Sequence, residues 1–221
     1  HGMQMSGDSI ASGKAIGGCV VGNTPIDVPR DLKDYPDGIP IKEICQRMKL
    51  GERFYAYSQD ASLGRIVLRP IKNAWRTKQN AEIWELIYKW QMPDGMDRTA
   101  SLRATPDHRI MLRNGSYRAL SELCSGDSLM PFNRFYTRRK QSKYSRISLN
   151  NGDRAYEHCF IINELGIPYR PKLGPTGDIV HHVNFRSHDN SPANLHVMSR
   201  KDHLALHKKA TESFRKWYDN L

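Results

Sequence analysis

Short apolar and β-branched segments, separated by turn-forming residues, dominate residues 19–132. They predict strands at residues 20–28, 54–58, 65–71, 83–90, 101–104 and 109–112. Asn114 and Gly115 follow the last of these and predict a hairpin turn, because both residue types adopt positive φ. The apolar positions 41, 44, 45 and 48, preceded by Pro40, predict one short helix. This part of the chain is therefore expected to be mostly β.

The pattern changes in the C-terminal part. Residues 156–165 predict a helix that ends at Gly166, and residues 179–183, with the sequence IVHHV, predict a strand. A second helix is predicted over residues 199–209, with Ser199 as its N-cap. The order of strand, loop, strand and helix predicts a small ββα unit. The fold class expected for the whole chain is multi-domain α+β.

Segments without periodicity suggest where the domains end. Residues 1–18 are rich in Gly and Ser and are expected to form a flexible N-terminal arm that resembles a tag. Residues 133–146 have six basic residues, three aromatics and no acids, which favours a basic linker. The two domains are then residues 19–132 and 147–210, followed by a tail at 211–221.

Charge is distributed unevenly along the 221 residues, which carry a formal net charge of +11. Residues 133–221 hold 16 Lys and Arg against 8 Asp and Glu, whereas the first 132 residues hold 18 against 15. This excess indicates a polyanionic partner for the C-terminal part.

Other features of the composition exclude several classes. No apolar run is long enough to span a membrane, and four scattered cysteines do not form a disulfide framework. No signal peptide is recognised at the start. We expect a cytoplasmic protein of a bacterial or phage-infected cell, with no membrane partner.

Histidines are concentrated in one stretch, where seven of nine lie between residues 158 and 207. Neighbouring side chains on a strand point apart, so His181 and His182 suit two tasks, metal binding and proton transfer. On a helix, His203 and His207 share one face and can approach His181. The alternative is a set of surface and core histidines with no shared site. We expect His188 and His196 to be loop or packing residues.

Phosphodiester hydrolysis is the chemistry that such an array suits. Water must lose a proton, and an imidazole such as that of His182 titrates in the right range to accept it. One divalent metal would stabilise the charge on the phosphate and leaving oxygen. Mg²⁺ is the expected ion, with Mn²⁺, Zn²⁺ and Ni²⁺ as alternatives that histidines also bind. The amide of Asn194 is placed to tie the loop between the strands.

The segment VHHVNFRSHDNSPANLHVMSRKDHLALHKK resembles the HNH nuclease family, and the resemblance extends over about residues 147–210. It implies that His182 is the general base and that Asn194 organises the site. It further implies that His181 and His203 are metal ligands, with His207 as an additional ligand.

The N-terminal half resembles the Hint fold of inteins and hedgehog-type autoprocessing domains. Cys19 follows Gly17 and Gly18, and TPDH occupies residues 105–108, together with IPIKEI and NGSYRALSELCSGDSLMPF. The resemblance implies that Cys19 attacks the preceding carbonyl, with Thr105 and His108 assisting this N–S acyl shift. The remaining cysteines, Cys45, Cys124 and Cys159, are expected in the core.

The chain departs from inteins at its end, because SFRKWYDNL replaces the terminal His-Asn step. Complete splicing is not expected from this chain alone, and a separate C-terminal intein fragment is a candidate partner. The preferred hypothesis is an intein-associated homing endonuclease that nicks or cuts double-stranded DNA. The residues expected to contact DNA are Arg134, Arg138, Arg139, Lys140, Lys143, Arg146 and Arg186.

Two alternatives stay open. One is an autoprocessing Hint domain that acts through Cys19 and carries an inactive, DNA-binding HNH unit. The other is a DNA-binding module without catalysis, which would bind DNA in a salt-sensitive manner but would not nick it.

Overall fold

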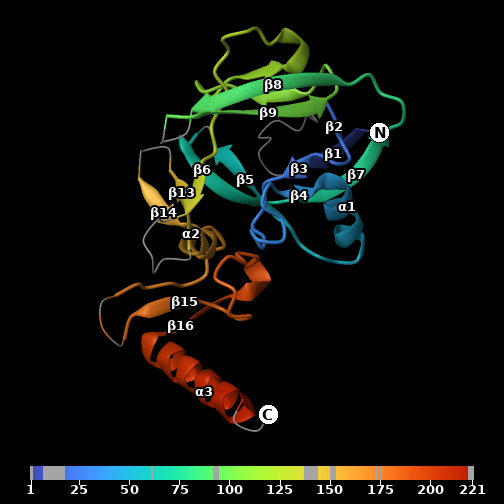
Figure 1. The fold of residues 1–221 in the computed structure, drawn as a ribbon. Coiled ribbons are helices and arrows are strands. Elements are labelled where there is room, and N and C mark those ends of the chain that lie inside the picture. The colour runs from blue at the N-terminus through green and yellow to red at the C-terminus, as the bar shows by residue number, and fades with distance from the viewer. Residues whose placement is uncertain are drawn as a thin grey trace. The chain divides into compact units, whose positions relative to one another are not determined.

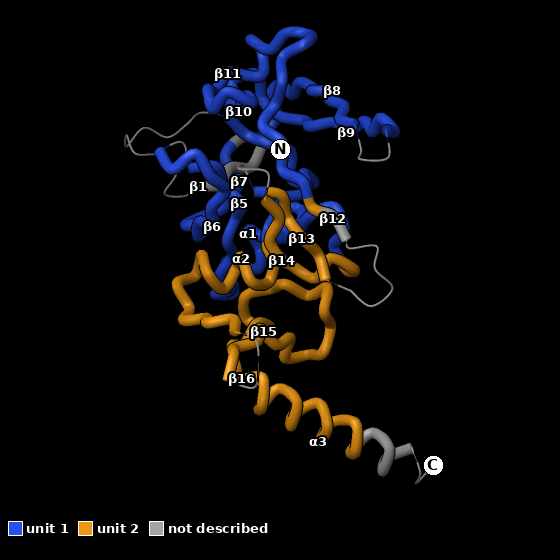
Figure 2. The backbone as a smooth tube through the Cα atoms, turned by 90° about the vertical axis from the view of Figure 1, so that its left-hand side faces the viewer, with its two compact units in different colours: residues 1–28, 35–133, 149–151 blue, residues 29–34, 134–148, 152–221 orange. Residues whose placement is uncertain are grey.

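A computed structural model of the chain describes residues 2–6, 18–60, 62–91, 95–136, 144–149, 153–172, 174 and 176–218. The described part is an α+β structure, mostly strands with three α-helices. It divides into two compact units (Figure 2). Unit 1 comprises residues 1–28, 35–133 and 149–151, and unit 2 comprises residues 29–34, 134–148 and 152–221.

Unit 1 is mostly β (Figure 1). Its elements are β1 (Gly2–Ser6), β2 (Val20–Val21), β3 (Pro25–Ile26), β4 (Ile39–Pro40), α1 (Ile41–Lys49), β5 (Tyr55–Asp60), β6 (Arg65–Pro70), β7 (Asn73–Lys78), β8 (Trp84–Gln91), β9 (Asp97–Ala104), β10 (Arg109–Met111), β11 (Tyr117–Ala119) and the 3₁₀ turn η1 (Leu120–Glu122). Five antiparallel strands form one sheet in the order β7-β1-β2-β9-β8. Unit 1 also contains three separate two-stranded sheets, formed by the pairs β3–β4, β5–β6 and β10–β11.

The core of unit 1 forms where α1 brings its apolar face to the strands. Ile41, Ile44 and Cys45 are buried on that face, as the spacing of apolar positions predicts. They belong to one cluster with residues of the strands, including Val20, Ala74 and Ala104. The helix predicted over 40–48 is therefore confirmed.

Several strands of unit 1 differ from the sequence prediction. The strand expected over residues 20–28 is divided into β2 and β3, and β4 was not predicted. Residues 2–6 were expected in a flexible arm but form β1, which pairs with β2 and β7. The rest of that arm, residues 7–17, lies outside the described residues. Strand β7 was not predicted, because apolar and polar residues alternate only weakly in its sequence, NAWRTK. Its extended conformation is accompanied by antiparallel pairing with β1.

The hairpin at Asn114 is confirmed in a different form. Gly115 has a φ of +86°, but Asn114 does not adopt positive φ. Instead, Asn114 Oδ1 accepts hydrogen bonds from the backbone nitrogen and the hydroxyl of Ser116, at 3.0 and 2.8 Å. The turn is therefore a longer loop closed by an Asn side chain, rather than a two-residue type I′ turn.

Unit 2 contains eight described elements. They are β12 (Arg134–Tyr136), β13 (Ser145–Ser148), β14 (Arg154–Tyr156), α2 (Glu157–Glu164), β15 (Asp178–His182), the 3₁₀ turn η2 (Pro192–Asn194), β16 (Leu195–Ser199) and α3 (Arg200–Tyr218). Strands β12, β13 and β14 form an antiparallel sheet, and β15 pairs with β16. In Figure 1, α3 follows β16 directly, which gives the expected order of strand, loop, strand and helix.

Two segments of unit 2 were assigned elsewhere by the sequence. The expected linker, residues 133–146, supplies β12 and part of β13 to the sheet of unit 2. The segment 29–34, from the N-terminal half, also belongs to unit 2. There Leu32 donates its backbone N–H to His188, and Arg30 accepts one from Asn190, at 2.9 and 3.0 Å. Unit 2 is therefore not contiguous in sequence.

Among the described residues, no helix is both long enough and apolar enough to cross a membrane.

Candidate functional site

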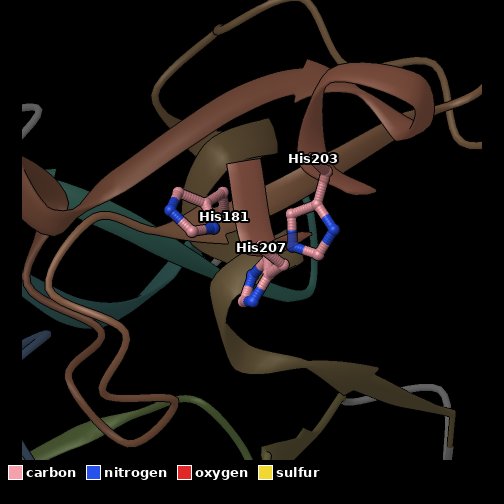
Figure 3. A group of neighbouring side chains, drawn as sticks. All are labelled: His181, His203 and His207. Atoms are coloured by element: carbon pink, nitrogen blue, oxygen red, sulfur yellow. The ribbon is translucent and has the colours of Figure 1, made fainter. Parts of the chain in front are cut away.

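Three histidines of unit 2 converge from two elements (Figure 3). His181 lies on β15, and His203 and His207 lie one turn apart on α3. One ligand nitrogen from each ring lies within 4.8 Å of the other two. The ring centroids are 5.2 Å apart for His181 and His203, and 4.4 Å apart for His203 and His207. The structure thus brings together the three residues that the sequence proposed as ligands.

The electrostatic surroundings of this histidine cluster favour the neutral form of the imidazole rings, which is the form that binds metals. Burial lowers the pKa of His181, and the neighbouring His203 and His207 lower it further by repulsion between positive charges. Burial and the proximity of His207 also lower the pKa of His203. A metal accepts neutral imidazole, so a depressed pKa leaves the ring ready to bind.

The spacing fits a divalent transition metal after a small closure. A tetrahedral ion with bonds of about 2.1 Å needs nitrogens about 3.4 Å apart. The three nitrogens, which lie within 4.8 Å of one another, must therefore approach by up to roughly 1.4 Å to hold such an ion.

Phe185 borders the cluster and was not identified from the sequence. Its ring meets His181 and His207 edge to face, with centroid distances of 5.2 and 5.1 Å. Its φ of +59° is rare for a bulky residue. No spacing or residue type in the sequence predicts that Phe185 contacts these histidines, because the contact depends on the conformation of the loop after β15.

His182 points to the opposite side of β15 from His181, as alternation along a strand predicts. Its Nε2 lies 3.2 Å from Asn190 Oδ1, and its ring stacks with Tyr144 at 5.8 Å. Burial lowers the pKa of His182, and the hydrogen bond with Asn190 opposes this effect. The two adjacent histidines therefore have separate surroundings, which fits separate tasks.

Asn194 ties the loop between β15 and β16. Its Oδ1 accepts the backbone N–H of Asn184 at 2.9 Å, and its Nδ2 donates to the backbone oxygen of Asp189 at 2.8 Å. Its backbone oxygen also accepts from Val183. These contacts are what the role of a loop organiser requires.

The basic residues expected to contact DNA differ in their structural surroundings. Arg134 is largely buried and forms an ion pair with Glu157 at 2.8 Å. Arg146 lies over the ring of Tyr156, with 4.3 Å from the guanidinium carbon to the ring centroid, and hydrogen-bonds its hydroxyl. Arg138, Arg139, Lys140 and Lys143 lie outside the described residues. The guanidinium of Arg134 therefore stabilises the fold of unit 2 through this ion pair. A count of basic residues does not show which of them form such internal ion pairs.

Arg186 is 42% exposed and pairs with two acids of segment 29–34. Its guanidinium lies 2.9 Å from Asp31 and 3.0 Å from Asp34. His188 also pairs with Asp31, at 2.7 Å, and His196 is exposed. Both histidines lie outside the histidine cluster. His188 is a loop residue, as expected, whereas His196 lies on the strand β16 and is exposed, which corrects the expectation of a loop or packing position.

A second group of functional candidates lies in unit 1 around Cys19. Its backbone N–H donates to Thr105 Oγ1 at 2.8 Å, and Thr105 donates its backbone N–H to the oxygen of Cys19 at 2.8 Å. The buried Sγ of Cys19 lies 2.8 Å from Thr77 Oγ1. Thr77 was not predicted, because β7 was not.

The peptide before Cys19 is closely packed. Gly18 has a φ of +113°, and a Cβ at this position would lie 2.3 Å from the Cα of His108. Burial lowers the pKa of His108, and a hydrogen bond with the backbone of Gly18 opposes this shift. His108 Nδ1 is buried without a hydrogen-bond partner. The sequence-predicted trio of Cys19, Thr105 and His108 is thus assembled around the Gly18–Cys19 bond.

The remaining cysteines divide between core and surface. Cys45 is buried as expected, whereas Cys124 is exposed, which corrects the expectation of a core position. The Cys124 backbone N–H bonds Asp127 in a turn, so the apolar sequence around it does not bury the thiol. Cys159 is half-buried, with its Sγ 3.4 Å from the hydroxyl of Tyr169.

Comparison with known proteins finds similarity to part of a longer protein. No family model matches the chain. A similar protein is the B subunit of DNA gyrase from Synechocystis sp. (strain ATCC 27184 / PCC 6803 / Kazusa), which is 28% identical over 212 residues. The alignment covers 90% of this chain but 18% of that protein, so the chain spans less than a fifth of the curated relative it matches.

Proposed function

We propose that unit 2 is an HNH-type endonuclease that hydrolyses DNA phosphodiester bonds with one divalent metal and His182 as general base. The observation that carries this proposal is the convergence of His181, His203 and His207, with His182 on the opposite side of the same strand. This arrangement would separate a cation site, formed by β15 and α3, from a proton acceptor on the other side of β15.

The histidine cluster would hold the metal through its three imidazoles. Imidazole suits zinc and nickel better than magnesium, which prefers oxygen ligands. The donor set therefore favours Zn²⁺ or Ni²⁺ over the Mg²⁺ that is usual for nucleases. When bound, the metal supplies Lewis acidity for a phosphate oxygen and the leaving oxygen.

The protein's own groups perform the remaining tasks. His182 accepts the proton of the attacking water, a contribution of roughly 10²- to 10⁴-fold. Asn194 keeps the loop after β15 in place through its hydrogen bonds to the backbone at Asn184 and Asp189. The proton then resides on His182 until solvent removes it.

Double-stranded DNA is the proposed substrate because the positive charge is concentrated in residues 133–221. Arg186 and the basic residues between 137 and 143 remain proposed phosphate contacts. Arg134 is excluded from this set, since its guanidinium is engaged by a buried carboxylate.

The test is nicking of supercoiled plasmid by the full chain with added Zn²⁺, Ni²⁺, Mn²⁺ or Mg²⁺. His182→Ala should lose cleavage and retain salt-sensitive DNA binding. His196→Ala changes an exposed histidine outside the cluster and should cut like the wild type. An undiminished cutting rate in His182→Ala would refute its role as base.

A second function is favoured by the geometry around Cys19. We infer that unit 1 is a Hint-type processing domain, in which the Cys19 thiol attacks the Gly18 carbonyl and the amide becomes a thioester. Thr105 holds the Cys19 amide, and His108 lies beside the same peptide, where it can protonate the departing nitrogen. The whole chain would then be an intein-associated homing endonuclease.

The comparison is compatible with that combination. An element carried inside a longer host protein would match a small share of that host, and the alignment covers 18% of the gyrase relative.

Thiol treatment tests the processing activity. Dithiothreitol should release the segment before Cys19, and Cys19→Ala should abolish the release. Cys124→Ala is the matched control, because that thiol is exposed and lies outside the site. Release of the same fragment from Cys19→Ala would show that Cys19 is not the nucleophile.

A further inference from the structure

A buried polar network lies next to His182 in unit 2. It consists of Arg134, Ser145, Glu157 and Asn190 and is called the Glu157 network here. Glu157 and Asn190 are both 0% exposed, and Ser145 is 1% exposed. Burying a carboxylate is costly unless it is paired and hydrogen-bonded, so the arrangement of these groups needs an explanation.

The carboxylate of Glu157 is surrounded by donors. Arg134 donates from Nε and Nη2 at 3.0 and 2.8 Å. Ser145 Oγ donates at 2.6 Å, and Asn190 Nδ2 donates at 3.1 Å. The Asn190 amide nitrogen also lies 2.9 Å from Ser145 Oγ, which accepts from it.

This environment fixes the orientation of the Asn190 amide. An ionised carboxylate only accepts hydrogen bonds, so the NH₂ group of Asn190 must face Glu157. The carbonyl Oδ1 is then directed to His182, where it lies 3.2 Å from Nε2. Because Oδ1 only accepts, Nε2 of His182 must carry the hydrogen.

We propose that the Glu157 network holds neutral His182 in the tautomer with hydrogen on Nε2, which leaves Nδ1 as the atom that takes the proton from water. Asn190 and Glu157 are positioning residues that act through His182. This inference rests on the proposed nuclease function for its catalytic consequence, while the tautomer itself is independent of that function.

The cost of the network supports a role beyond packing. Well-packed apolar residues often replace buried ion pairs with no loss of stability, so folding alone does not require this arrangement. A hydrogen bond on one ring nitrogen determines which nitrogen of a histidine is protonated. The network supplies that bond from a rigid, fully buried group.

The tautomer is measured by nitrogen-15 NMR of the metal-free full chain, with two-bond correlations within the imidazole rings. The spectrum is recorded at a pH where the ring of His182 is neutral, and His182→Ala assigns its signals. The expected result is a protonated Nε2 and an unprotonated Nδ1. A protonated Nδ1 in the wild type would overturn the inference.

Two variants test the chain of contacts. Asn190→Leu keeps a similar side-chain size but removes the acceptor, so the His182 signals should shift toward a mixture of tautomers. Glu157→Gln gives the carboxylate position an NH₂ group, which lets the Asn190 amide reverse and favours hydrogen on Nδ1. Asn163→Leu, at an exposed position of α2, is the control and should keep the wild-type tautomer.

Nicking rates connect the tautomer to the reaction. In both variants kcat should fall by about tenfold or more with KM for DNA unchanged, as supporting contacts around catalytic groups commonly show. Circular dichroism confirms folding; if one variant unfolds, the other and the wild-type spectrum still decide the outcome. Wild-type tautomer and kcat in a folded variant would overturn the inference.

The two proposals fail in distinguishable ways. Absence of nicking by the wild type with every metal would refute the nuclease function, and the NMR result would still decide the tautomer. Nicking by a wild type whose His182 carries hydrogen on Nδ1 would leave the nuclease function in place and remove the network's role.

Discussion

His158 provides a prediction whose size follows from the structure. It lies on α2, is 7% exposed, and its Nδ1 is buried without a hydrogen-bond partner. Its ring packs against those of Tyr144, Tyr156 and His182, with centroids 4.9, 5.6 and 5.3 Å away. Burial, with a smaller contribution from the charge of His182, lowers its pKa to about 4, and Glu157 opposes the shift.

The sign of the effect is set by the unfolded chain, where a histidine has a pKa near 6.5. Below that value the unfolded state binds a proton that folded His158 does not, so stability falls as pH decreases toward 4. Between about pH 7 and about pH 5, proton linkage costs the folded protein about 2 kcal/mol. Stability is thus fully present above pH 6.5.

Urea denaturation at these two pH values measures the effect. His158→Phe keeps a ring at the position and removes the titrating group, so its loss of stability on acidification should be about 2 kcal/mol smaller than that of the wild type. Groups that do not interact with His158 titrate alike in both proteins, and the comparison of differences cancels them. His196→Gln, at an exposed site, should behave like the wild type. Equal losses in His158→Phe and wild type would refute the reasoning.

Three further changes have defined outcomes. Arg134→Ala removes the cation that pairs with the buried carboxylate of Glu157 and should lower the free energy of unfolding by roughly 3–5 kcal/mol in urea denaturation; an unchanged value would contradict a structural ion pair. Asn194→Ala removes the hydrogen bonds of the Asn194 amide and should lower the free energy of unfolding by about 1–3 kcal/mol in the same assay. The variant should also lose nicking activity. Wild-type stability and nicking in this variant would count against Asn194 as the organiser of the loop. Gly18→Ala places a Cβ 2.3 Å from the Cα of His108, so thiol-induced cleavage, followed by gel electrophoresis, should be strongly reduced; a wild-type rate would show that this close packing is unnecessary.

Features with local causes were predictable from the sequence. The helix α1 follows from apolar spacing, and its residues Ile41 and Ile44 are buried as expected. The histidine cluster was predictable because strand alternation and the four-residue spacing of His203 and His207 each depend on neighbouring residues only. Strand alternation also places the ring of His182 among different neighbours from those of His181.

Features that depend on distant pairing were not predictable. Strand β12 and the burial of Arg134 depend on Glu157, which is 23 residues away and carries no signal of pairing in its own sequence. Segment 29–34 joins unit 2 through contacts with residues near His188, more than 150 positions later. Asn190 was overlooked because its importance arises from what surrounds it in space.

The central claim is that the histidine cluster binds one metal on which DNA hydrolysis depends. Its most direct test is nicking of supercoiled plasmid by chelator-treated protein as Zn²⁺ or Ni²⁺ is added back, with bound metal measured in the same samples. We predict that nicking rises with metal and saturates at one bound equivalent, and that His203→Ala neither retains the metal nor nicks. Nicking by His203→Ala at the wild-type rate, or by metal-free wild type, would contradict the account.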